Sequence, residues 1–193
     1  MKGFNHRKAV QALNFFAQRE GGAINKMKAI KLIWLSDRLH LRRFGRTITG
    51  DTYFALPFGP VASNTRDILE ASSFCSDEEL TYGSAYISSI DRYNYSTIAD
   101  TELKVFSKSD LDAFAEVYQV YGHLNKFELS ELSHLFPEWK KWESALAASK
   151  SRYLMDLEDF FEESITENPL FQDDKENLSL ALKIFNRADY KPQ

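Results

Sequence analysis

The stretch that decides the fold is residues 25–61, which read NKMKAIKLIWLSDRLHLRRFGRTITGDTYFALPFGPV. In its first half, apolar residues recur at the three- and four-residue spacing of an α-helix, and further leucines widen the apolar arc beyond a single stripe. Asn25 can cap the first turn of this helix, and Gly45 can adopt the positive φ angle that ends it. The pattern predicts a central, nearly buried helix that carries Trp34 in the core or at its rim.

The second half of the stretch predicts a turn, a short strand and the start of another helix. Residues 49–52 have turn chemistry, and residues 53–56 have strand propensity. Pro57 cannot donate to a ladder, so the strand ends there or lies at an edge. Gly59 before Pro60 fits a helix N-terminus, because proline is favoured at the first helical position. We therefore expect a sharp chain reversal that leads into a helix.

Four short motifs follow one another along the chain, and their order is more specific than any single one. They are DRLHL at 37–41, GRTIT at 45–49, YFALPFGPV at 53–61 and LSHLFPEWK at 132–140. Together they resemble the Panacea domain, the SocA-like antitoxin domain of bacterial and phage toxin–antitoxin systems, over roughly residues 8–146. The resemblance implies direct neutralisation of a cognate toxin, often encoded by an adjacent gene. Family toxins belong to unrelated classes, so the toxin itself is not identified.

Composition favours one folded domain over residues 1–193. The apolar fraction is 44% and the aromatic fraction 14%, which support a real core. We expect an α+β, mainly α, fold with a central buried helix and a small two- or three-stranded antiparallel sheet. The family-like core would span 8–146, followed by acidic and amphipathic helices at 150–189.

The sequence also points to a cytoplasmic protein. A single cysteine, Cys75, excludes an internal disulfide framework. No apolar run is long enough for a membrane span, and no apolar segment of a signal peptide follows the N-terminus. We expect no membrane partner and no cofactor.

Other segments of the chain have weaker but readable patterns. The acidic segment 156–176 contains Phe160 and Phe161 and predicts a docked helix with a solvated acidic face. Ser109 and Asp112 have capping-box spacing at the start of a helix. Further helices are predicted over residues 7–20 and 178–185, in a segment that ends at about 71, in one that ends at about 122, and in segments that begin at 125 and at 137. Residues 72–91 are expected to form a mobile loop, and residues 93–98 and 103–106 are expected to form paired strands.

Charge is unevenly distributed, although the net charge is only −4. Residues 1–70 carry twelve Lys/Arg against five Asp/Glu, and residues 71–193 carry twelve against twenty-three. Such asymmetry either steers a charged partner or pairs internally. We favour internal pairing, because one domain brings the two halves together.

The central helix also carries a basic strip. On an ideal helix, four cations cluster on one side: Lys28, Lys31, Arg38 and Arg42. A basic strip raises the nucleic-acid hypothesis. The acidity of the whole chain and the lack of a recognisable DNA-binding module lower it. We expect this side of the helix to be solvated or to face a protein partner.

Asp37 and His40 are the strongest candidates for catalysis or metal binding, because their spacing can place both on one helical face. No third ligand follows at a telling spacing, so we favour hydrogen bonding that fixes the following turn. We interpret His134, near Pro137 and Trp139, as the anchor of a helix junction. The sequence therefore predicts a protein that is not an enzyme.

We expect the work to be done by a binding surface. The candidate partner contacts are Arg43, Arg46, Arg66 and Phe58, an aromatic residue that a turn displays. The expected structural set is Trp34, Asp37, His40, Gly45, Tyr53, Pro57, Gly59, Pro60, His134 and Trp139. The alternatives to a toxin-blocking antitoxin are a proteolytic adaptor that delivers its partner to a protease, another phage or host regulatory interaction protein, and, less favoured, a nucleic-acid-binding regulator.

Overall fold

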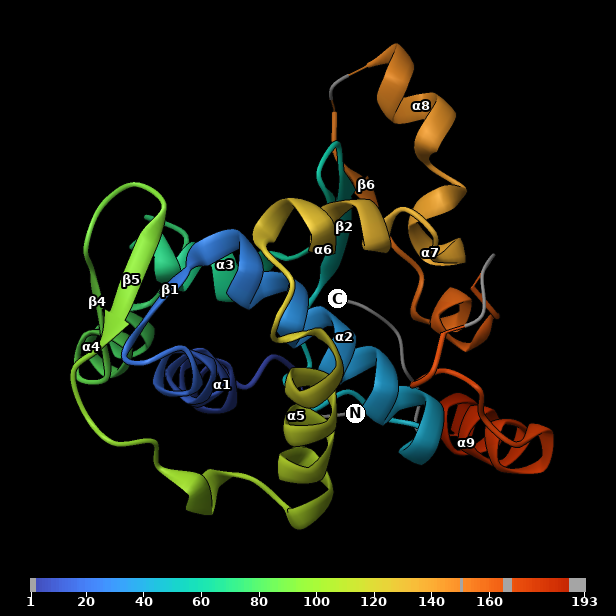
Figure 1. Ribbon diagram of the computed structural model, residues 1–193, viewed down its shortest axis with the longest axis horizontal. Coiled ribbons are helices and arrows are strands. Elements are labelled where there is room, and N and C mark those ends of the chain that lie inside the picture. Colours follow the sequence, from blue (N-terminus) through green and yellow to red (C-terminus); the bar gives the residue numbers. More distant parts are fainter. Residues whose placement is uncertain (1–2, 150, 165–167, 188–193) are drawn as a thin grey trace.

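A computed structural model describes residues 3–149, 151–164 and 168–187, and it is mainly helical with two small antiparallel sheets (Figure 1). Its helices are α1 (His6–Arg19), α2 (Lys26–Phe44), α3 (Ser63–Leu69), α4 (Asp77–Ser84), α5 (Lys108–Tyr121), α6 (Lys126–Ser133), α7 (Pro137–Lys140), α8 (Glu143–Ala148) and α9 (Lys175–Arg187), with 3-10 helices η1 (Leu103–Val105) and η2 (Leu157–Phe161). Its strands are β1 (Ala23–Asn25), β2 (Tyr53–Leu56), β3 (Gly59–Ala62), β4 (Ile87–Ser89), β5 (Asn94–Thr97) and β6 (Tyr153–Leu154). The predicted fold class, α+β and mainly α, is confirmed.

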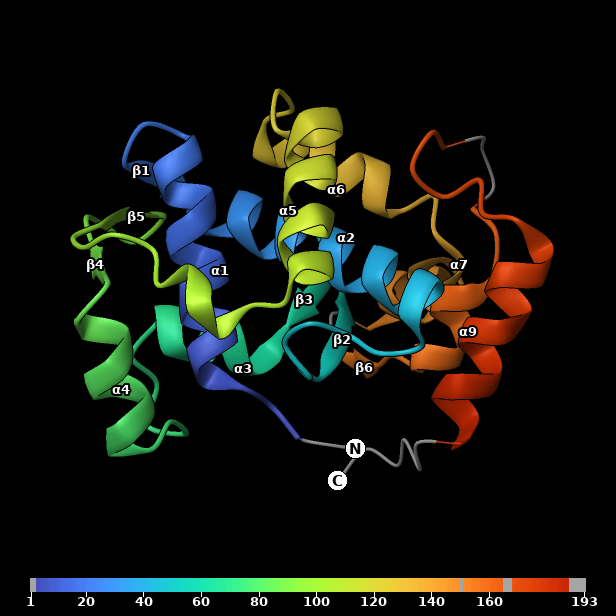
Figure 2. The ribbon, with the colours of Figure 1, turned by 90° about the horizontal axis from the view of Figure 1, so that it is seen from below.

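Helix α2 is the centre of the structure. It packs against α1, α5, α6 and α9, and Figure 2 shows α1 and α9 on opposite sides of it. Every residue from Lys28 to Arg42 is buried, because neighbours cover the helix on all sides. The Asn25 side chain accepts from the Met27 amide at 3.1 Å, and Gly45 ends the helix with a φ of 67°. The expected central helix and both of its caps are confirmed.

The strands form two sheets where the sequence predicted one. One sheet has the order β1-β5-β4 and the other β3-β2-β6, with every pairing antiparallel. The strand expected at 93–98 is β5, but residues 103–106 are not its partner, since 103–105 form η1. Strand β5 pairs instead with β1, from the short connection before α2, and with β4, from the segment expected to be a mobile loop.

The prediction of a helix start at Gly59 and Pro60 is wrong. These residues begin β3, which folds back on β2 with Leu56 opposite Gly59. Gly59 has a φ of 95°, and Pro60 is tolerated because β3 lies at the edge of its sheet. Helix α3 begins only at Ser63. Its first turn is capped from a distance by Asp51, whose carboxylate accepts from the Asn64 amide at 2.9 Å.

Two further segments differ from expectation. The predicted mobile loop over 72–91 contains α4, whose first turn is closed by a capping box between Ser76 and Glu79. The acidic segment 156–176 contains the short 3-10 helix η2, whose residues Phe160 and Phe161 are buried, and the first two residues of α9, and it is not one docked helix. Residues 165–167 of that segment lie outside the described residues. Residues 188–189, the last two of the C-terminal helices expected over 150–189, also lie outside them.

Candidate partner-binding interface

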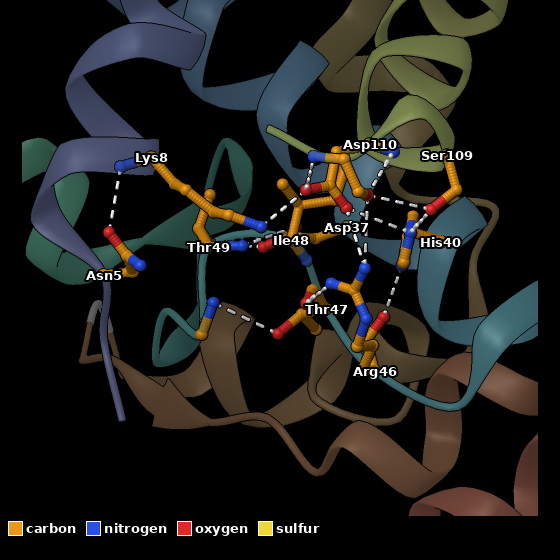
Figure 3. Close-up of polar contacts among 12 residues, drawn as sticks. Asn5, Lys8, Asp37, His40, Arg46, Thr47, Ile48, Thr49, Ser109 and Asp110 are labelled. Atoms are coloured by element: carbon orange, nitrogen blue, oxygen red, sulfur yellow. Dashed lines mark hydrogen bonds and ion pairs between the residues drawn. The ribbon is translucent and has the colours of Figure 1, made fainter. Parts of the chain in front are cut away.

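Asp37 fixes the turn that follows α2 (Figure 3). Its buried carboxylate accepts from the backbone amides of Ile48 at 2.6 Å and Thr49 at 3.1 Å. It also accepts from the Thr49 hydroxyl, and from the Tyr53 hydroxyl at 2.7 Å. Burial raises the pKa of Asp37, and the hydrogen bonds from Thr49 and Tyr53 oppose that rise. Both oxygens are occupied by protein donors, which is the arrangement of a structural carboxylate.

His40 and Asp110 join α2, α5 and α1 in one buried polar cluster (Figure 3). The Nδ1 of His40 donates to the Arg46 carbonyl at 2.8 Å, and its Nε2 lies 3.2 Å from Asp110. Asp110 also contacts Lys8 Nζ at 2.5 Å. Burial alone would raise the pKa of Asp110, but hydrogen bonds from His40 and Lys8 outweigh burial and lower it well below its usual range.

Asp110 is a buried structural side chain that the sequence prediction missed. It forms a capping box with Ser107, accepting from the Ser107 amide at 3.0 Å, so the box lies two residues before the predicted Ser109 and Asp112 pair. The signal was present, since Ser107 and Asp110 have the same spacing. Among the described residues, no group of three or more His, Cys, Asp or Glu side chains could hold a metal ion.

The basic strip of α2 is buried, which contradicts the expectation of a solvated or partner-facing side. Three of its four cations meet carboxylates from elsewhere in the chain: Lys28 with Glu20 at 2.8 Å, Arg38 with Glu138 at 2.9 Å, and Arg42 with Asp173 at 2.5 Å and Glu163 at 2.7 Å. The fourth, Lys31, donates to the Pro60 carbonyl. The strip is covered because α6, η2 and α9 pack against α2, and because α7 supplies Glu138 to Arg38. Internal pairing between the basic and acidic halves, which the charge distribution favoured, is confirmed.

The four expected partner contacts fall into two separate places. Arg43 forms a bidentate pair with Glu116 at 2.7 and 2.8 Å, and Arg46 contacts Asp110 at 3.1 Å. Both therefore lie at the interface between α2 and α5. Phe58 and Arg66 line a groove at the other end of α2, which the start of this helix forms together with other elements. The structure does not bring the two sets together.

This groove has a volume of about 840 Å³ and is formed by five elements: the start of α2, the β2–β3 hairpin, α3, the turn between β4 and β5, and the start of α6 (Figure 1). Its apolar lining comes from Ile30, Leu56, Val61 and Leu69. Three exposed rings lie along it, Phe58 at 63%, Tyr93 at 57% and Phe127 at 58% exposed. Exposed rings of this size are typical anchors of protein interfaces.

The hairpin tip beside the groove is held by the downstream motif at 132–140 and by the residues just before it. The indole nitrogen of Trp139 donates to the Leu56 carbonyl at 2.8 Å, and the His134 ring stacks on Trp139 at 3.7 Å between centroids. Ser130 donates to the Phe58 carbonyl at 2.9 Å. Burial lowers the pKa of His134, which favours a neutral ring in this stack. The motif thus fixes the loop that displays Phe58.

The sequence prediction missed most of the groove. Tyr93 and Phe127 had no companion motif, since they lie far from Phe58 in the chain and only the fold assembles them. The cations Lys26, Arg92 and Lys126 also line it. The signal available for Phe127 was its place next to the predicted cap at Asn125.

None of the helices formed by the described residues is long and apolar enough to cross a membrane.

Comparison with known proteins supplies the family. The model of the family described as Antitoxin SocA-like, Panacea domain matches residues 30–140, from α2 to α7 and more than half of the chain. A search of curated proteins and a search of solved structures found no match. The matched range contains Asp37 and its hydrogen-bond partners, the β2–β3 hairpin, and the motif at 132–140 that supports the hairpin. This chain belongs to the SocA-like antitoxin family defined by the Panacea domain.

Proposed function

We propose that this protein is an antitoxin that neutralises a cognate toxin by direct protein–protein binding, without chemistry of its own. Membership of the SocA-like antitoxin family supports a role in a toxin–antitoxin system. The observation that carries the proposal is the groove, where the exposed rings Phe58, Tyr93 and Phe127 gather around an apolar lining. A rigid surface with several exposed aromatic anchors is suited to a protein partner.

We place the toxin contact at Phe58 and Arg66. Phe58 lies at the tip of a hairpin whose position is fixed by Ser130 and Trp139, so little conformational freedom is lost on binding. Arg66 is 29% exposed and pairs only at 3.5 Å or more with Asp67 and Glu70, which leaves its guanidinium available to a partner.

Arg43 and Arg46 form a second candidate surface, at the end of α2. A toxin would have to compete there with Glu116 and Asp110 for the two guanidinium groups. This competition is the reason that we rank the second surface below the groove. Charge reversal separates the two.

We further propose that the protein acts in the cytoplasm.

We also propose that residues beyond the family match belong to the same domain. Helix α9 packs directly against α2, and Asp173 and Glu163 pair with the buried Arg42. Removing these acidic partners would leave a buried guanidinium uncompensated. The C-terminal segment therefore acts as part of the core and not as a separate module.

The test is expression of the protein with the adjacent gene in a bacterial host. We expect that the neighbouring product alone arrests growth and that the intact protein restores it. The Arg66→Glu variant should lose the rescue, and Arg43→Glu should keep it. The opposite ranking would move the interface to the end of α2, and failure of the intact protein to bind or rescue would overturn the proposal.

Toxin abundance in the same cells distinguishes blocking from delivery to a protease. Direct neutralisation predicts an unchanged amount of toxin, held in a complex that co-purifies with the antitoxin. A fall in toxin abundance that depends on a host protease would identify a proteolytic adaptor instead.

A further inference from the structure

Lys31 differs from the other cations of its helix face. Lys28, Arg38 and Arg42 each pair with a carboxylate, whereas Lys31 has no ion pair with any described residue. Its side chain is only 1% exposed, and its Nζ donates to the Pro60 carbonyl at 2.8 Å. An ammonium group carries three donors, so this single acceptor leaves it under-satisfied. Burial lowers the pKa of Lys31 well below its usual value, as expected for a buried amine without a counter-ion.

Lys31 lies at the groove and not elsewhere in the core. Gly59 makes room for it, since a Cβ at that position would overlap both Lys31 Nζ and Ser133 Oγ. The absence of a side chain on Gly59 therefore lets the amine reach the backbone beneath the hairpin tip. A donor that the described residues satisfy only in part thus lines the cavity that we propose as the binding site.

The rim of the groove has the same sign of charge. Lys26, Arg66, Arg92 and Lys126 line it, and of the described residues only Glu70 adds a carboxylate to the lining, which lies 3.7 Å from the Arg66 guanidinium. This local excess of positive charge contrasts with the net charge of −4 for the whole chain. An occupant with negative charge is therefore favoured at this one place.

Rings and cations alternate along the rim. Lys126 Nζ lies 5.5 Å from the centre of the Tyr93 ring and 5.0 Å from that of Phe127. The Arg92 guanidinium lies 5.6 Å from the Tyr93 ring. A partner that binds here must offer apolar side chains to the rings and carboxylates to the cations between them.

We propose that the groove binds an acidic, apolar segment of the toxin, and that one carboxylate of this segment pairs with Lys31. This inference rests on the proposed antitoxin function and specifies the chemistry of the partner. Apolar side chains of the segment pack on Phe58, Tyr93 and Phe127. Its remaining acidic groups meet the rim, so the complex supplies a counter-ion that no described residue of the free protein provides.

A nucleic acid fits these features less well. Phosphate backbones are bound by rows of exposed cations, and this affinity falls steeply with salt. Here four cations line the rim, but the innermost cation, Lys31, is a buried amine beside Ile30 and Pro60, where a single carboxylate can pair with it. Competition by single-stranded DNA tests this alternative.

The experiment is a selection of random displayed peptides on the purified full chain, with single-stranded DNA as a competing probe. We expect the enriched peptides to combine Asp or Glu with large apolar residues. Replacing their acidic residues by Asn or Gln should weaken binding by about 10-fold or more. The Lys126→Glu variant should weaken the acidic peptides similarly, whereas Lys183→Glu, an exposed control on α9, should not.

Lys31→Met tests the buried amine itself, since methionine is similar in volume and removes both the charge and the donor to the Pro60 carbonyl. We expect it to weaken the acidic peptide but not the Asn or Gln version, a non-additive result that a purely structural lysine would not give. If Lys31→Met does not fold by circular dichroism, Lys126→Glu decides.

Enrichment of neutral or basic peptides, unchanged binding to these variants, or tighter binding of the DNA would overturn the inference. These outcomes leave the proposed function separately testable. A toxin that is still neutralised by the Lys126→Glu variant would show an antitoxin that works without the acidic contact, whereas failure of the intact protein to rescue would count against the proposed function.

Discussion

Asp110→Asn is the sharpest test of what holds α1, the end of α2 and α5 together. The substitution keeps the size and one acceptor oxygen of the side chain but removes its negative charge. The carboxylate has a fully buried side chain and contacts Lys8, Arg46 and His40, in addition to capping α5 through Ser107. Loss of the charge should loosen the joint between α1, the end of α2 and α5.

The contacts set the size of the effect. A hydrogen bond to a charged group contributes about 1.5–3 kcal/mol, and breaking a buried pair costs about 3–5 kcal/mol. The side chains of Lys8 and Arg46 are 17% and 40% exposed, so both can turn toward water and recover part of the loss. His40 is fully buried and cannot. We therefore expect Asp110→Asn to lower the free energy of unfolding by about 2–4 kcal/mol at neutral pH.

The pH dependence has a definite sign. The pKa of Asp110 is lowered in the folded protein, so its contribution is complete above the unfolded pKa of about 4 and is lost as the pH falls below it. In urea unfolding, the free energy of unfolding of Asp110→Asn should differ most from that of the unsubstituted protein near pH 7. The difference should narrow as the pH falls from about 4 toward about 3.

Asp112→Asn is the matched control, because Asp112 is an exposed carboxylate two residues further along the same helix. We expect it to change the free energy of unfolding by less than about 0.5 kcal/mol. An equal effect of the two substitutions, or a difference for Asp110→Asn that does not narrow in acid, would refute the assigned role of Asp110.

Two further predictions concern the hairpin and α6. In thermal unfolding, Gly59→Ala should destabilise the protein by more than Gly21→Ala. Both glycines have positive φ angles, but only at Gly59 would a Cβ overlap Ser133. Equal losses of stability would show that the hairpin tip has room for a side chain. Asn125→Ala should cost about 1 kcal/mol, because Asn125 forms a capping box with Glu128 at the start of α6. Hydrogen exchange that does not rise within α6 would contradict this second prediction.

Local signals in the sequence predicted the centre of the fold. Asn25 and Gly45 cap α2 through contacts within a few residues, so the spacing alone indicated them. The favoured interpretation of Asp37, a carboxylate that bonds the following turn, also depends on close neighbours in the chain and matches the hydrogen bonds observed.

The burial of the basic strip could not be predicted in the same way. Helical periodicity indicates which residues share a face, but it does not indicate what covers that face. Glu138 and Asp173, which pair with Arg38 and Arg42, lie 100 and 131 residues further along the chain. Only the assembled fold determines that these cations are paired and that Lys31 has no carboxylate partner in the described part of the chain.

The Gly59–Pro60 pair shows a second limit. A Gly-Pro pair suits both a helix N-terminus and the return strand of a hairpin, and the sequence alone does not decide between them. The hairpin forms because β2 has a partner strand on each side, β3 and β6, and β6 comes from residues 153–154. The groove was missed for the same reason, since Tyr93 and Phe127 come from separate segments.

The central claim is that the groove is the toxin-binding surface, and the affinity of purified toxin for Phe58→Ser tests it most directly. Phe58 is 63% exposed, so binding can cover about 130 Å² of a ring of about 200 Å², which corresponds to about 3 kcal/mol, or about 100-fold in Kd. Phe74→Ser is the control, since Phe74 is 88% exposed and does not line the groove. We predict a loss of about 100-fold for Phe58→Ser and no loss for Phe74→Ser. Equal affinity of the two variants for the toxin would contradict the account.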